Sequence, residues 1–220
     1  MAEAKTEIVM TSAGAAEDVL LRPAPFLASV MQIEPQWIDY NGHLNMAYYN
    51  VMFDRAIDEL WLKLGIGPGY MKERQRSTFT AECHVRYLRE IHLGDPVQVS
   101  VLLVAADEKR LHTFEELRHA GEGWLSATSE NMTIHIDMSA RKTAPFPPDI
   151  RARIEKLANA HSAIPRPEGI GAKVDALEIA VTGQASALLD RRCVVYRRVL
   201  AQQHVVSGIW HYSVGAFAFA

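Results

Sequence analysis

The sequence predicts an α+β fold in which an antiparallel sheet wraps around one long central helix. An apolar stripe with helical spacing runs through residues 46–64, and four segments with the two-residue period of strands follow between residues 78 and 137. Short turns rich in Gly, Asp and Lys join these four segments, so neighbouring strands must run antiparallel. A helix followed by a run of strands is typical of the α+β class.

The first predicted strand covers residues 26–35 and ends at Pro35. Four apolar residues lie in it among few charges: Phe26, Leu27, Val30 and Ile33. The turn-forming residues 39–45 follow, and Asn45 stands where an N-cap would satisfy the unpaired amides of a helix. We therefore expect the central helix to begin at Met46.

The central helix is predicted over residues 46–64. Its apolar residues recur every three or four positions and share one face: Tyr49, Met52, Phe53, Ala56, Ile57, Leu60 and Leu64. Polar residues such as Asn50 and Lys63 lie elsewhere on its surface. The helix is expected to end in the Gly- and Pro-rich residues 65–69.

Four strands are predicted after this helix, over residues 78–90, 96–106, 110–120 and 124–137, and a short amphipathic helix over residues 147–161. In the first of these strands, alternate positions are apolar: Phe79, Ala81, Cys83, Val85 and Tyr87. That alternation indicates a sheet with one covered face. A single sheet-and-helix layer leaves the other face or an edge available, so we expect self-association.

Composition excludes several classes of protein. The chain has 220 residues, a net charge of −3 and two cysteines, Cys83 and Cys193, without paired spacing. This charge balance gives no broad attraction for nucleic acid or an anionic membrane. The cysteines indicate neither a zinc site nor a disulfide framework, and no run approaches the ~18 apolar residues of a membrane-spanning helix. We expect a cytoplasmic protein that binds neither nucleic acid nor membrane.

Three segments are predicted along the chain. Residues 1–25 contain small and charged residues without the apolar run of a signal peptide, and we expect a flexible leader. Residues 26–170 form the folded domain. Residues 171–220 contain none of the ten prolines and few acidic residues, and the sequence assigns this C-terminal tail no role.

The densest group of functional residue types is residues 37–49, which lead directly into the central helix. A helix N-terminus exposes backbone amides and the positive end of the helix dipole, which can polarise a carbonyl or hold an oxyanion. Beside it, the carboxylate of Asp39 could attack an activated carbonyl or act as general base toward water. This combination indicates acyl-transfer chemistry, although Asp39 and Asn45 could equally be no more than turn and cap residues.

Residues 26 to 171 resemble the hot-dog-fold acyl-CoA thioesterases of the 4-hydroxybenzoyl-CoA thioesterase family. Asp39-Tyr40-Asn41-Gly42-His43-Leu44-Asn45, followed by Tyr48 or Tyr49, is similar to the family signature Asp-x-x-Gly-His-x-Asn, and Ile91-His92-Leu93-Gly94-Asp95 to its Gly-Asp turn. The resemblance implies a hot-dog fold, a catalytic Asp39 and a Met46 backbone amide that polarises the thioester carbonyl. Residues 35–43 and 107–112 are most similar to thioesterases of carnitine catabolism that act on betainyl-CoA.

The remaining candidates for the active site have more than one interpretation. Asn45 is expected to cap the helix and hold it in place, and His43 could orient the loop, contact substrate or be structural, of which we favour the structural role. Asp54 is a reserve candidate because some enzymes of this fold take their catalytic carboxylate from the central helix.

Candidate substrate-binding residues are Trp37, Tyr40, Tyr48, Tyr49, Arg141 and Lys142. The aromatic residues could line an acyl pocket or bind a quaternary ammonium by cation–π attraction, although core packing explains them equally well. The two basic residues could contact coenzyme A phosphates, as similar residues do in the family, or form a solvated turn.

The sequence thus predicts a thioesterase that hydrolyses a small or medium acyl-CoA to the free acid and CoA. CoA is part of the substrate, and no cofactor is expected. None of the nine histidines shows metal-ligand spacing, so no metal is expected. We expect a homodimer or homotetramer with the active site between subunits. The alternatives are a non-catalytic acyl-CoA sensor and a hot-dog enoyl-CoA hydratase or dehydratase.

Overall fold

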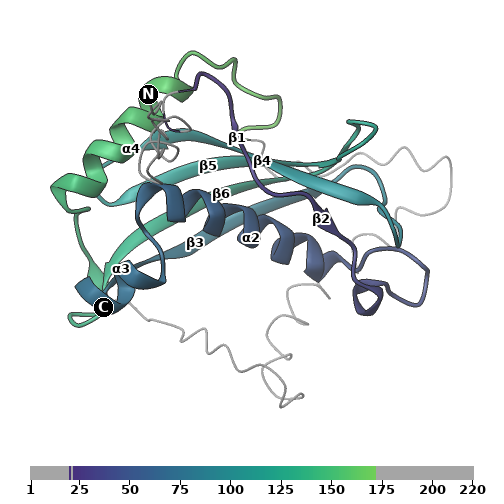
Figure 1. The fold of residues 1–220 in the computed structure, drawn as a ribbon, viewed down its shortest axis with the longest axis horizontal. Coiled ribbons are helices and arrows are strands. Elements are labelled where there is room, and N and C mark those ends of the chain that lie inside the picture. Colours follow the sequence, from purple (N-terminus) through teal and green to yellow (C-terminus); the bar gives the residue numbers. More distant parts are fainter. Residues whose placement is uncertain (1–19, 21, 172–220) are drawn as a thin grey trace, which may run out of the picture. The chain divides into compact units, whose positions relative to one another are not determined.

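The computed structural model describes residue 20 and residues 22–171 (Figure 1). The predicted C-terminal tail and nearly all of the predicted leader lie outside these residues. The described chain forms one antiparallel sheet in the order β1-β4-β5-β6-β3, with β2 also pairing with β4 and β7 with β6. The α+β class is therefore confirmed.

The elements that the sequence predicted from the central helix onward have bounds close to those observed, whereas α3 and β7 were not predicted. The strands are β1 (Phe26–Leu27), β2 (Met31–Gln32), β3 (Arg76–Tyr87), β4 (Pro96–Ala106), β5 (Arg110–His119), β6 (Leu125–Asp137) and β7 (Lys142–Thr143). The helices are η1 (Pro35–Trp37), α2 (Met46–Leu64), α3 (Pro68–Arg74) and α4 (Pro148–His161).

Helix α2 begins and ends at the predicted residues because local groups satisfy its termini. The Asn45 side-chain oxygen accepts a hydrogen bond from the Ala47 amide at 3.0 Å, which is the predicted N-cap. At the other end, Gly65 has a φ of 80°, and its amide donates to the Leu62 carbonyl at 3.1 Å. Glycine suits this left-handed position because it has no Cβ.

The core lies between the sheet and the two longer helices. Figure 1 shows α2 crossing in front of the sheet, with α4 at the left. Arg153 of α4 donates to the carbonyl of Leu64, the last residue of α2, at 3.3 Å. One apolar cluster joins both helices to the sheet, and its fully buried members include Met52, Ala56, Leu60, Leu64, Val97, Val99, Val101, Leu111, Leu117, Ala127 and Leu157.

The prediction of one continuous strand over residues 26–35 is wrong. The segment divides into β1 and β2, which pair with different parts of the same strand, Phe26 opposite Val101 and Met31 opposite Val97. Between them, the backbone amide and hydroxyl of Ser29 donate to the carboxylate of Glu59 on α2, at 2.9 and 3.0 Å. Ser29 is thus bonded to the helix, while the neighbouring Ala28 amide still donates to the Val99 carbonyl of β4 at 3.0 Å.

The sequence analysis did not predict helix α3, because it assigned Pro68 and Gly69 to the end of α2. Proline lacks an amide hydrogen and has a helical φ, so it also suits the first turn of a new helix. The same short sequence therefore ends one helix and begins the next.

Strand β3 departs from its predicted pattern. A bulge between Thr80 and Glu82 shifts the register, so Phe79 lies opposite Ile134 whereas Cys83 lies opposite Asn131. Directly opposed residues share a face of the sheet, and β6 alternates, so Phe79 and Cys83 lie on opposite faces. The strand is also exposed along much of its length, so neither face is fully covered in a single chain.

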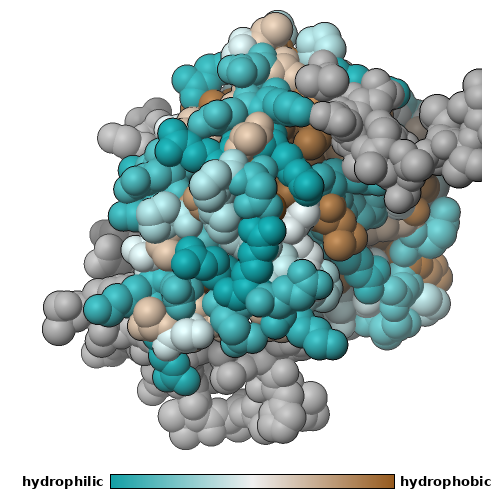
Figure 2. Space-filling view, turned by 60° about the vertical axis from the view of Figure 1, so that its left-hand side comes forward, coloured by the Kyte–Doolittle hydropathy of each residue, from teal (hydrophilic) through white to brown (hydrophobic). Residues whose placement is uncertain are grey.

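The surface of the described domain is mainly polar on the face where α3 and α4 come forward (Figure 2), with scattered apolar patches. None of the helices in residues 22–171 combines the length and the apolar character that crossing a membrane requires.

Candidate active site

The signature residues form a closed loop that leads into α2. Ile38 pairs with Leu44 across the loop, and the Asn45 amide donates to the Trp37 carbonyl at 2.9 Å. Inside this pair, the Asp39 amide donates to the His43 carbonyl at 2.9 Å. The pairing brings the chain back to the start of α2 and keeps Asp39 on the loop at that end of the helix.

The Asp39 carboxylate has one oxygen held by the loop. Oδ1 accepts hydrogen bonds from the Asn41 amide at 2.8 Å and, more weakly, from the His43 amide at 3.4 Å. Oδ2 has no hydrogen bond to any residue that the structure describes, and the side chain is only half-buried. Asp39 therefore stabilises the turn through Oδ1, and its Oδ2 atom is available to react.

The first turn of α2 presents an amide without an intramolecular partner. Asn45 uses its side chain for the Ala47 amide and its carbonyl for the Tyr48 amide, at 3.0 Å each. Within the described chain, no hydrogen bond to the Met46 amide is found. It is an available donor at the positive end of the helix dipole, which is what an oxyanion site needs. Its catalytic role stays a prediction.

The candidate aromatic residues do not form one pocket. Trp37 is buried and stacks on Tyr48, with ring centroids 5.3 Å apart, and the guanidinium of Arg55 lies 4.9 Å from the Trp37 centroid. Tyr49 is buried, whereas Tyr40 is 98% exposed. The Trp37 ring therefore already contacts the guanidinium cation of Arg55. Binding of substrate by these aromatic residues stays a prediction.

Arg141 and Lys142 lie at the other end of the sheet from the signature loop. They follow β6, whose last residue, Asp137, pairs with Arg76 at the start of β3. Strand β3 then runs to Tyr87, whose hydroxyl donates to the Met46 carbonyl at 3.4 Å. Twelve strand residues span roughly 35–40 Å, so one chain does not bring its two basic residues to its own Asp39.

Comparison with known proteins identifies the family of the chain. Residues 33–154 match the family model of the thioesterase-like superfamily. The chain belongs to this superfamily. The predicted hot-dog fold and the predicted kind of enzyme, a thioesterase, are thereby confirmed at the level of the family.

Three similar proteins show the extent of the similarity. The betainyl-CoA thioesterase of Pseudomonas aeruginosa is 41% identical over 137 residues, which cover 62% of this chain and 86% of that protein. A Staphylococcus aureus protein solved in complex with CoA is 28% identical, with a TM-score of 0.65 over 69% of this chain and 96% of that one. A solved Pseudomonas putida protein is 30% identical, with a TM-score of 0.60 over the same shares.

Beneath α2, this thioesterase-like domain has a buried polar network that the sequence prediction missed. Glu115 of β5 is fully buried, and its Oε1 accepts hydrogen bonds from Asn131 at 2.5 Å and Thr113 at 3.2 Å. The Ser129 hydroxyl donates to the Asn131 side-chain oxygen at 3.0 Å. The sequence contains a signal for this network, because Glu115 shares the covered face of its strand with the apolar residues Leu111 and Leu117.

Burial raises the pKa of Glu115 to about 8, so this carboxyl is mostly protonated at neutral pH. Hydrogen bonds from Asn131 and Thr113 lower that pKa in part, while the charge of Asp54 raises it. Burial also raises the pKa of Asp54 and of Asp58, and the charge of Asp54 adds to the rise at Asp58. The reserve candidate Asp54 is thus coupled to the carboxyl under the helix.

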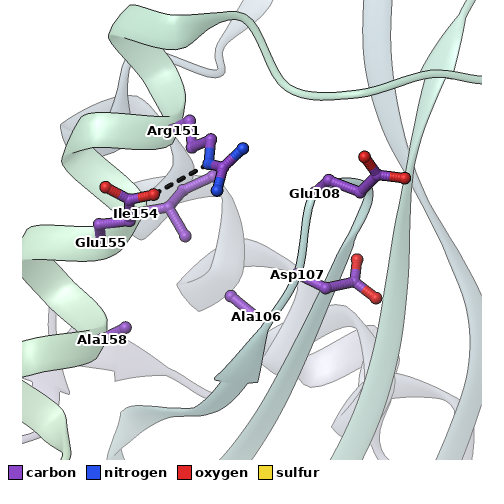
Figure 3. Close-up of a pocket in the computed structure, with 7 residues that line it drawn as sticks. All are labelled: Ala106, Asp107, Glu108, Arg151, Ile154, Glu155 and Ala158. Atoms are coloured by element: carbon purple, nitrogen blue, oxygen red, sulfur yellow. Dashed lines mark hydrogen bonds and ion pairs between the residues drawn. The ribbon is translucent and has the colours of Figure 1, made fainter.

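A hollow of about 290 Å³ lies elsewhere, between α4 and the turn that joins β4 to β5 (Figure 3). Its lining comprises Ala106, Asp107, Glu108, Arg151, Ile154, Glu155 and Ala158. Arg151 donates to Glu155 at 2.9 Å on α4, and Asp107 accepts from the amides of Lys109 and Arg110 in the turn. None of the candidate active-site residues lines this hollow, and its charged groups serve the local structure.

Proposed function

We propose that this protein hydrolyses the thioester of a small or medium acyl-CoA, with Asp39 as the carboxylate that attacks the carbonyl or activates water. The observation that carries the proposal is the closed loop between Ile38 and Asn45. It holds the Asp39 carboxylate at the end of α2 where the Met46 amide is available as a donor. Membership of the thioesterase-like superfamily supports the same reaction.

The geometry is compatible with two routes. As a general base, Asp39 takes a proton from water, the water oxygen attacks the thioester carbon, and the CoA thiolate leaves and is protonated. As a nucleophile, Asp39 forms an anhydride with the acyl group, releases CoA and is freed by water. In both routes the carbonyl oxygen becomes negative, and a backbone donor such as Met46 would stabilise it by about 2.7–4 kcal/mol.

The acyl group that we favour is short and polar. A relative that is 41% identical is named for betainyl-CoA, whose acyl group carries a quaternary ammonium. The carboxylates of Asp54 and Asp58 lie four residues apart on the exposed side of α2, and negative charge there favours a cationic acyl chain over an anionic one. The similarity to a protein solved with CoA supports the CoA part of the substrate.

We further propose that two chains share the site through β3. The sheet order places β3 at an edge, with β6 as its neighbour among the described strands, so a further strand can add beside it. A second β3 would continue the sheet and could bring the partner's basic residues to this chain's signature loop. A homotetramer would need an additional interface. We also propose a cytoplasmic location, which the two cysteines without paired spacing support.

The substitution Asp39→Asn tests the proposed function by release of free thiol from a panel of acyl-CoAs that includes betainyl-CoA. We expect turnover to fall by roughly 10²–10⁴-fold, because an amide neither attacks nor takes a proton. The remaining side-chain oxygen can still accept from Asn41 and His43, so the loop is retained. Asp107→Asn is the matched control, since Asp107 also accepts backbone amides in a turn but lies away from the loop.

The same panel separates the alternatives. Full activity of the Asp39→Asn protein would remove Asp39 from the mechanism. If Asp54→Asn abolished turnover instead, the carboxylate on the helix would take its place. Tight binding of acyl-CoA by the unmodified protein without any thiol release would support the sensor considered above.

A further inference from the structure

Three side chains that can ligate a metal meet at the edge of the signature loop. His43, Glu90 and His92 each offer a nitrogen or oxygen atom, and these three atoms lie within 4.8 Å of one another. His43 Nε2 is 3.3 Å from a Glu90 carboxylate oxygen. The imidazole rings of His43 and His92 are nearly perpendicular, with centroids 5.4 Å apart. Only His43 belongs to the signature itself.

The backbone explains why these residues converge. The Leu44 amide donates to the Ile91 carbonyl at 3.0 Å, and this bond joins the signature loop to the loop after β3. His43 precedes Leu44, while Glu90 and His92 flank Ile91 on both sides. Because Leu44 and Ile91 are both buried in the core, the two loops are fixed where they present the three polar side chains.

Asp95 adds a second carboxylate behind His92. Its Oδ2 accepts the His92 amide at 2.9 Å and lies 3.9 Å from His92 Nδ1. Histidines that bind metals commonly direct their other ring nitrogen to a carboxylate, which orients the ring. The Asp95 carboxylate thus lies beside the His92 ring, where it can help to orient that ring.

The chemistry of the three groups selects a class of ion. Two imidazoles and one carboxylate suit zinc and neighbouring divalent transition metals, whereas calcium and magnesium prefer oxygen ligands alone. The side chains of His43 and Glu90 are 38% and 66% exposed, so an ion can enter from solvent. We propose that His43, Glu90 and His92 bind one divalent transition-metal ion per chain, with zinc as the expected occupant.

This site goes beyond the proposed hydrolysis, which uses Asp39 and the Met46 amide and requires no metal. A bound ion would link the loop that carries Asp39 to the loop after β3. The ion would thereby limit the motion of the signature loop without itself contacting the reacting groups. Sequence spacing did not indicate the site because its ligands come from two loops that only the fold brings together.

The test is a metal titration of the full chain, without an affinity tag and after treatment with chelator. Zn²⁺ binding is measured by calorimetry, and Co²⁺ binding by its visible absorption. We expect one saturable site per chain, with Glu90→Gln and His92→Ala each weakening it by about tenfold or more. His112→Ala is the control, because His112 and Glu130, 2.7 Å apart, are another His–carboxylate pair, and no described residue adds a third ligand to it.

Thermal unfolding gives a second readout. Zn²⁺ should raise the unfolding midpoint of the unmodified protein, since an ion that binds the folded state stabilises it, and should raise it much less for the two variants. Circular dichroism checks that each variant folds, and His92→Gln replaces His92→Ala if the latter does not. The Asp39→Asn protein should retain full metal affinity, which separates this proposal from that of hydrolysis.

The proposal is overturned by three results. These are no saturable binding at millimolar metal, binding that the Glu90 and His92 variants leave unchanged, and a stoichiometry of one ion shared by two chains.

Discussion

Glu115 shows how one buried side chain sets the pH dependence of stability. Its pKa is about 8 in the folded protein and near the ordinary value of 4.5 in the unfolded chain. Between these values the unfolded chain has lost a proton that the folded protein keeps. The free energy of unfolding contributed by this residue therefore falls as pH rises from about 4.5 to about 8, with a slope of up to about 1.4 kcal/mol per pH unit.

We predict that Glu115→Gln removes this slope. Glutamine retains an oxygen that can accept from Asn131 and Thr113, and it carries no charge to desolvate. The variant should therefore be more stable than the unmodified protein at pH 7, and the difference should grow from pH 5 to pH 8. Urea unfolding across this range measures it, with Glu108→Gln as an exposed control. Parallel stability curves would contradict the assignment.

At the scale of elements, the start of α2 links stability to activity. The Asn45 side chain accepts the Ala47 amide, and the adjacent Met46 amide is the proposed oxyanion donor. Asn45→Ala removes the cap, which should cost about 1 kcal/mol of stability. It should also lower kcat more than it raises KM, because a frayed first turn no longer fixes the donor.

Two further substitutions distinguish these effects. Asn45→Ser keeps a capping oxygen and should restore both stability and turnover. Asn45→Asp should restore stability alone, because a carboxylate beside the donor repels a developing oxyanion. Unfolding curves and thiol release together measure the outcome, and full turnover by Asn45→Asp would argue against an oxyanion site at this turn.

The elements that the sequence predicted well are those with local signals. The bounds of α2 follow from a cap at Asn45, a regular apolar stripe and a stop at Gly65, all within one stretch of chain. The break between β1 and β2 depends instead on Glu59, thirty positions away from Ser29, and no local pattern reports such a bond. The β3 bulge likewise appears only in its pairing with β6.

At the scale of the whole molecule, the position of β3 at the edge of the described sheet predicts a dimer. Cys83 is exposed near the middle of this strand, so a two-fold axis across the edge would bring the two copies of this position near each other. We predict that Cys83→Glu weakens the dimer, because like charges meet across the paired strands. Activity should fall with dissociation, since the proposed site is shared.

Sedimentation velocity over a range of protein concentrations measures the association, alongside thiol release. Ala152→Glu, which adds the same charge at an exposed position of α4, is the control. A protein that sediments as a monomer yet hydrolyses acyl-CoA at an unchanged rate would contradict both the dimer and the shared site.

The sequence by itself determined the α+β class, the bounds of α2, its cap at Asn45 and the position of Asp39 just before that helix. Each of these depends on hydrogen bonds or apolar periodicity within a short stretch of chain. Only the tertiary structure decided which groups are buried and which meet. It placed Glu115 under α2, gathered His43, Glu90 and His92 from two loops, and separated Arg141 and Lys142 from Asp39, because strand pairing and core packing join residues that are distant along the chain.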